Sequence, residues 1–174
     1  MKALFLCVLP LLAVATTLYA QSTLALTPKE STCQTPKYPQ PAYLIQKWGI
    51  EKGDTILLKF LTTKFPSLVR DANLVIHTSG NQFPSVTSVE VFLPSAWDIK
   101  IRGDKKLELK PVKCDFKVEG DSLILTGPDL VKVMNDWKNA TIPNHGLAIQ
   151  AALPHLISID SHQASKPPQL ILTP

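Results

Sequence analysis

The fold is decided by the stretch from Ser122 to Ala152, which reads SLILTGPDLVKVMNDWKNATIPNHGLAIQAA. Its first four residues predict a short strand. Large apolar residues then recur at helical spacing and predict a helix of about ten residues with one buried face: Leu130, Val133, Met134 and Trp137. Pro143 ends this helix, and 147–151 predicts a second, buried strand. We therefore expect the helix to close a gap between two strands of a β-rich fold.

Short strands are predicted along the rest of the chain, where alternating or continuous apolar runs are separated by turn residues. These runs are 55–61, 73–78, 87–93, 99–102, 107–110, 112–118, 156–159 and 169–172. About ten short strands with a single helix favour two packed antiparallel sheets over alternating strands and helices. The fold class is therefore predicted as all-β, an antiparallel β-sandwich with one short helix near the C-terminal third.

The N-terminus has the pattern of a secretory signal peptide. A basic start at Lys2 precedes an apolar run over 4–18, which Pro10 interrupts, and Leu18-Tyr19-Ala20 resembles a cleavage site. We predict a signal peptide over 1–20, with an uncleaved N-terminal anchor as the alternative. Cleavage would leave no transmembrane segment and would place the protein outside the cytoplasm, either secreted or periplasmic.

The part after the signal is predicted to form one domain, because about 154 residues suit a single core. Prolines at 36, 39 and 41 favour an extended segment, so residues 21–41 are predicted to be a Pro-rich tether and 42–174 the sandwich domain. Cys7 lies within the predicted signal, which leaves Cys33 and Cys114. An even pair in an exported chain predicts a disulfide, with two free thiols as the alternative.

The charge of the chain indicates whether nucleic acid is an expected partner. The net charge is +4, charged residues make up 18%, and Arg70 and Arg102 are the only arginines. No arginine-rich tract is present, so we do not expect nucleic acid as a partner.

Several short motifs resemble the DNRLRE-type domains, a family of jelly-roll modules that includes carbohydrate-binding modules of secreted proteins. The similar stretches are Leu57-Leu58-Lys59-Phe60, Ala72-Asn73-Leu74, 127–137, Asn144-His145-Gly146-Leu147 and 161–173. The resemblance covers most of 55–174 but not the segment from Ser95 to Glu119. It implies a jelly-roll sandwich and hints at polysaccharide binding.

Sugar-binding sites combine a flat aromatic ring with polar groups that read the hydroxyls. The candidate rings are Tyr43, Trp48 and Trp97, each with packing as the alternative role, whereas Trp137 is predicted to lie in the core. Lys100 and Arg102 follow Trp97 and begin a basic stretch. They predict attraction to an anionic polysaccharide, or simply a solvated strand face.

Catalytic and metal-binding patterns are weak. Asp160-Ser161-His162 contains the three residue types of a hydrolase triad, but adjacency does not make triad geometry. The four histidines have no zinc-site spacing, so no metal or other cofactor is expected. We predict a non-catalytic carbohydrate-binding protein that binds an anionic polysaccharide. The alternatives are a structural or adhesion protein that binds a partner without sugar binding, and a polysaccharide-degrading enzyme.

Overall fold

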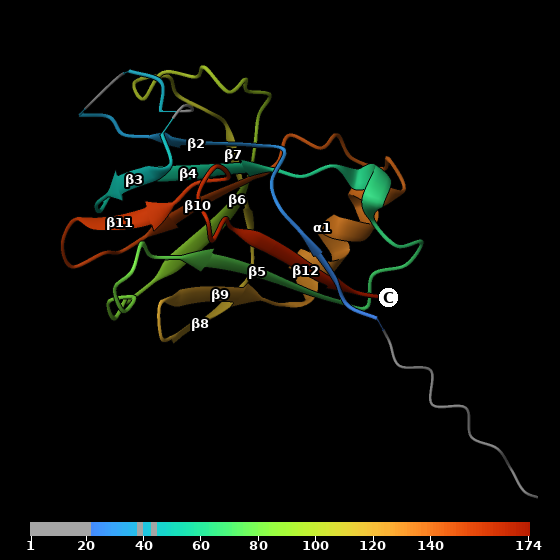
Figure 1. Cartoon of the computed structure of the whole chain (residues 1–174). Coiled ribbons are helices and arrows are strands. Elements are labelled where there is room, and N and C mark those ends of the chain that lie inside the picture. Colours follow the sequence, from blue (N-terminus) through green and yellow to red (C-terminus); the bar gives the residue numbers. More distant parts are fainter. Residues whose placement is uncertain (1–21, 38–39, 43–44) are drawn as a thin grey trace, which may run out of the picture.

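The computed structural model describes residues 22–37, 40–42 and 45–174. In this part of the chain it has twelve strands, one α-helix and one short 3₁₀ helix (Figure 1). The strands are β1 (Leu24–Leu26), β2 (Glu30–Gln34), β3 (Lys47–Ile50), β4 (Thr55–Lys59), β5 (Asp71–His77), β6 (Val89–Pro94), β7 (Leu109–Val112), β8 (Asp115–Glu119), β9 (Ser122–Thr126), β10 (Leu147–Ala151), β11 (Ile157–Asp160) and β12 (Gln169–Thr173). The helices are η1 (Thr62–Lys64) and α1 (Pro128–Lys138).

Ten of these strands form two antiparallel sheets that pack face to face, which confirms the predicted all-β sandwich. Sheet A has the order β1-β12-β5-β9-β8, and sheet B has the order β2-β4-β10-β6-β7. When the extra strands β2 and β8 are set aside, eight strands remain, which we count from one to eight along the chain. Their order is 1-8-3-6 in sheet A and 2-7-4-5 in sheet B, which is the strand order of a jelly roll. Strands β3 and β11 pair separately as a two-stranded ribbon.

The middle of sheet B is buried on both faces. In β4, Leu58 faces the core between the sheets, while Leu57 lies on the outer face, and both are 0% exposed. The paired strand β10 repeats this arrangement with Leu147 inside and Ala148 outside. A second layer must therefore cover the outer face of sheet B.

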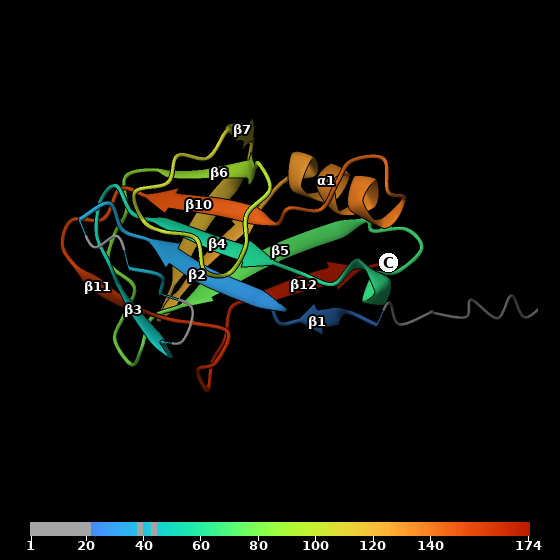
Figure 2. The same cartoon turned by 90° about the horizontal axis from the view of Figure 1, so that it is seen from above.

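Helix α1 closes one end of the sandwich, and the β3–β11 ribbon lies at the opposite end (Figure 2). The four residues predicted to form the buried stripe of α1 are all buried, so that prediction is confirmed. The Asn135 side chain holds the helix in place: its Oδ1 accepts from Val69 N at 2.9 Å, and its Nδ2 donates to Val69 O at 2.8 Å. No helix in the described part is long and apolar enough to cross a membrane.

The predicted tether is wrong for Leu24–Leu26 and Glu30–Gln34, because these residues form β1 and β2. Strand β1 pairs with β12, and β2 pairs with β4 along its whole length. Ser31 and Thr32 are buried although they are polar, since later parts of the chain cover β2. The predicted signal peptide over 1–20 lies outside the described residues.

The predicted disulfide is also wrong, because Cys33 and Cys114 are both free thiols. Cys33 lies in β2 at one edge of sheet B, and Cys114 follows β7 at the other edge. Four strand spacings separate these edges by about 19 Å, whereas a disulfide needs Cα atoms within about 7 Å. Burial raises the pKa of the Cys33 thiol to about 12 and that of Cys114 to about 11. Because no disulfide is present between these cysteines, the prediction of export rests on the N-terminal sequence pattern alone.

Candidate functional site

The segment 95–108 folds back over the outer face of sheet B and forms the layer that this face requires. We call it the cover segment. It supplies Trp97 and Ile101 to a small second core with Leu57 and Ala148. The sequence predicted a strand over 99–102, but Ile99 and Lys100 form a turn in the cover segment and 101–102 are irregular.

The predicted aromatic platforms are not available for stacking. Trp97 is only 8% exposed, and its Nε1 donates to the His145 carbonyl. Trp48 is 2% exposed, and its Nε1 donates to the Ala42 carbonyl at 2.9 Å. The prediction that these rings offer a sugar-binding surface is therefore wrong, because both pack into cores. Tyr43 lies outside the described residues.

The predicted cations do lie on the surface. Lys100 and Arg102 are exposed, as are Lys105 and Lys106 later in the same segment. Arg102 makes a two-point ion pair with Asp104, with both nitrogen–oxygen distances at 3.0 Å. This pairing lowers the pKa of the Asp104 carboxyl and raises that of Arg102.

The turn that carries these cations is fixed to sheet B. Gln34 in β2 donates from Nε2 to the carbonyls of Arg102 and Lys105, at 2.9 and 3.0 Å. Gly103 passes so close to β2 that a Cβ there would lie 2.4 Å from the Thr35 carbonyl oxygen. We define the cationic cover as Lys100, Arg102, Lys105 and Lys106. Its three lysines form no ion pair with any described residue, so their charges face solvent.

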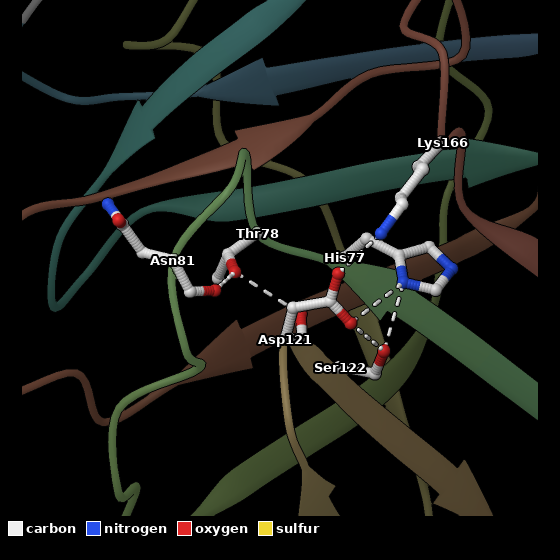
Figure 3. Close-up of polar contacts among 6 residues, drawn as sticks. All are labelled: His77, Thr78, Asn81, Asp121, Ser122 and Lys166. Carbon is white, nitrogen blue, oxygen red and sulfur yellow. Dashed lines mark hydrogen bonds and ion pairs between the residues drawn. The ribbon is translucent and has the colours of Figure 1, made fainter.

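A second polar cluster lies at the end of sheet A near the β3–β11 ribbon (Figure 3). Asp121, in the β8–β9 turn, accepts from Lys166 Nζ at 2.9 Å and from Ser122 Oγ at 2.9 Å. His77 Nδ1 is 2.9 Å from the same Ser122 oxygen. Thr78 closes the cluster, since its backbone N–H donates to the Asp121 carbonyl at 2.8 Å.

This cluster contains serine, histidine and aspartate, but its geometry is not that of a catalytic triad. In a triad the imidazole lies between the hydroxyl and the carboxylate and uses one nitrogen for each. Here Ser122 Oγ lies 2.9 Å and Asp121 Oδ1 3.8 Å from the same nitrogen, His77 Nδ1. The Ser122 hydroxyl donates to the Asp121 carboxylate and not to the imidazole. The same carboxylate binds Lys166, so the cluster ties the loop that carries Lys166 to the β8–β9 turn.

The triad residue types that are adjacent in the sequence are also separated by the fold. Ser161 is fully buried, and its hydroxyl accepts from Gln163 N at 3.1 Å. His162 instead pairs with Ser31, whose Oγ is 2.6 Å from Nδ1 and accepts from the His162 backbone N–H at 3.1 Å. Burial lowers the pKa of His162, which favours the neutral ring that can accept this hydroxyl proton. Among the described residues, no group of three or more His, Cys, Asp or Glu could hold a metal ion.

Asp121 gives a prediction about acid stability. Hydrogen bonds from Lys166 and Ser122 lower its pKa from 3.8 to about 2. Between these values the unfolded state binds more protons, so the carboxylate's contribution is complete above pH 4 and is lost as the pH falls towards 2. We expect Asp121→Asn to destabilise the protein at pH 5 and to have a smaller effect at pH 2. Urea unfolding of both proteins at each pH measures this difference, and a difference that is independent of pH would contradict it.

Sequence reasoning missed Asp121 and Lys166 as partners, since 45 residues separate them. The only local signal was the turn at Gly120, which places Asp121 at the tip of a hairpin.

No family model matches the chain, and no curated protein matches it. The resemblance to DNRLRE-type domains therefore stays a prediction.

Proposed function

We propose that the protein is an exported, non-catalytic module that binds anionic polysaccharide through the cationic cover. The observation that carries this proposal is three exposed lysines, without ion pairs to described residues, that lie on and beside a turn held by Gln34. Exposed cations that lie close together in one segment produce a local positive field that attracts polyanions. Export rests on the predicted signal peptide at residues 1–20.

The fixed turn favours binding, because the backbone that carries the lysines is already ordered. A mobile loop would lose conformational entropy on binding, and that loss would reduce affinity. Arg102 adds less, since its guanidinium is already engaged by Asp104. With Trp97 and Trp48 buried, charge rather than ring stacking drives this interaction. Binding should therefore weaken as salt rises, because exposed charges are screened over about 10 Å at 0.1 M.

A triple substitution, Lys100→Ala with Lys105→Ala and Lys106→Ala, tests the proposal. We expect affinity for polygalacturonate, measured by calorimetry at low salt, to fall at least about tenfold, since removing three charges costs more than 1.4 kcal/mol of binding. The matched control removes three exposed lysines that are ion-paired elsewhere: Lys29, Lys117 and Lys132. Both triple variants lose the same net charge, so only a local effect separates them. Equal losses would show a general charge effect and would refute the site.

The burial of all three tryptophans favours one other function, a structural or adhesion protein that recognises a partner without binding sugar. Binding of neutral dextran would not distinguish these two functions, because the proposed site needs a charged ligand. The decisive measurement is the binding of the parent protein to polygalacturonate. No saturable binding at low salt would reject polysaccharide binding and leave this second function.

A further inference from the structure

A polar hollow of about 550 Å³ lies beside the β3–β11 ribbon and shares no lining residue with the cationic cover. Three parts of the chain form it: the start of β3 with Gln46 and Lys47, the turn after β5 with Ser79, and the loop after β11 up to Lys166. We call it the ribbon hollow. Its volume is in the range of about 300–1,000 Å³ that small-molecule sites have.

The ribbon hollow contains a buried carboxylate without a complete set of partners. Asp160, the last residue of β11, lines it and is only 4% exposed. Its Oδ1 is buried and accepts no hydrogen bond from the described residues. Buried polar atoms are nearly always paired, and an unpaired carboxylate oxygen is costly. A bound molecule with a donor would offer this carboxylate a further hydrogen bond.

Two lysines give the same hollow a positive side. Lys47 lies directly opposite Asp160 in the β3–β11 pairing and makes no ion pair with a described residue. Lys166 also lines the hollow; its hydrogen bond to Asp121 raises its pKa, and the nearby Asp160 adds a smaller contribution. One Lys166 donor is used by Asp121 (Figure 3), but an ammonium has three. The hollow thus offers one acceptor and two cationic donors.

The walls of the hollow are held before any ligand arrives. Ser161 N donates to the Gln46 carbonyl at 2.8 Å, which extends the ribbon, and Ser79 N donates to the Ser158 carbonyl at 2.9 Å. The loop is fixed further along by the ion pair between Lys166 and Asp121. Such preorganisation lowers the entropic cost of binding.

We propose that the ribbon hollow binds one hexuronic acid, a sugar with a single carboxylate. A sugar hydroxyl donates to the Asp160 carboxylate, and the sugar carboxylate binds the ammonium groups of Lys47 and Lys166. Gln46, Ser79 and Ser165 on the lining can pair with the remaining hydroxyls. A small zwitterionic amino acid would also match the charges but would leave these neutral groups unused. This inference goes beyond the proposed function, since it involves neither the cationic cover nor a polymer.

Titration of the full chain with D-galacturonate, followed by calorimetry or by NMR chemical shifts, tests this site. We expect saturable binding, a loss of at least tenfold in affinity for Asp160→Asn, and a smaller loss for Lys47→Gln at the exposed rim. Asp54→Asn is the matched control, because Asp54 is also buried but its Oδ2 accepts from Glu51 N and it lies outside the hollow. D-galactose, which lacks the carboxylate, should bind at least tenfold more weakly.

Each outcome decides the assignment. Absent saturation with D-galacturonate, or equal affinity of the parent and Lys47→Gln, would overturn it. Tighter binding of glycine than of D-galacturonate would overturn the ligand class. The site is tested separately from the cationic cover, because the triple lysine variant described above should bind D-galacturonate as the parent does. If polygalacturonate binding fails while D-galacturonate binding holds, only the proposed polymer function is lost.

Discussion

Gly146→Ala is expected to destabilise the protein by about 3–5 kcal/mol, a large part of the total stability of an ordinary domain. Gly146 has φ +87°, where side chains are strained, and a Cβ there would lie 2.3 Å from the Leu58 carbonyl oxygen. That oxygen belongs to β4 in the middle of sheet B, so it cannot move without disturbing the pairing of β4 with β10. Asn144 holds the turn in place, since its Nδ2 donates to the Phe60 carbonyl at 2.8 Å.

Gly80→Ala is the matched control, because Gly80 also has φ +87° but a Cβ there meets nothing within 4 Å. It should cost only the strain of the left-handed backbone, about 1–2 kcal/mol. Urea unfolding of the three proteins measures both values. If the two substitutions cost the same, the close approach of Gly146 to β4 does not limit the fold.

The helix and the central strands could be predicted because their signals are local. The stripe from Leu130 to Trp137 needs only helical spacing, and a run such as 55–61 is apolar on both faces whatever surrounds it. Strand β2 could not be found this way. Its residues, ESTCQ, are mostly polar, and their partners come from distant parts of the chain: Ser31 pairs with His162, and Gln34 with the cover segment.

The burial of Trp97 had an indirect signal in the sequence. A strand that is apolar on both faces needs a layer on each side, and β4 provides both Leu57 and Leu58. Something therefore had to cover the outer face, but the sequence does not say which segment does so. Asp160 stood out in the sequence only as part of a possible triad, and nothing there indicated that it lies beside Lys47, because the two are 113 positions apart and meet only through strand pairing.

Trp97→Ala is expected to destabilise the protein by about 3–5 kcal/mol, as for other large buried aromatic residues. Its ring fills the second core between the cover segment and sheet B, next to Leu57 and Ala148. Loss of the ring removes this contact and also leaves the His145 carbonyl without the indole donor. An exposed ring would give almost no change, so urea unfolding separates the two placements directly.

Phenylalanine substitutions sharpen this test, because the indoles of Trp97 and Trp137 differ in their hydrogen bonding. Trp97 Nε1 has the His145 carbonyl as its partner, whereas Trp137 Nε1 is buried without a partner among the described residues. Trp97→Phe leaves a carbonyl unpaired, at a cost of about 1–3 kcal/mol beyond the lost volume. Trp137→Phe removes an unpaired donor instead, so it should cost clearly less. Equal costs in urea unfolding would show that the Trp97 hydrogen bond adds nothing to the attachment of the cover segment.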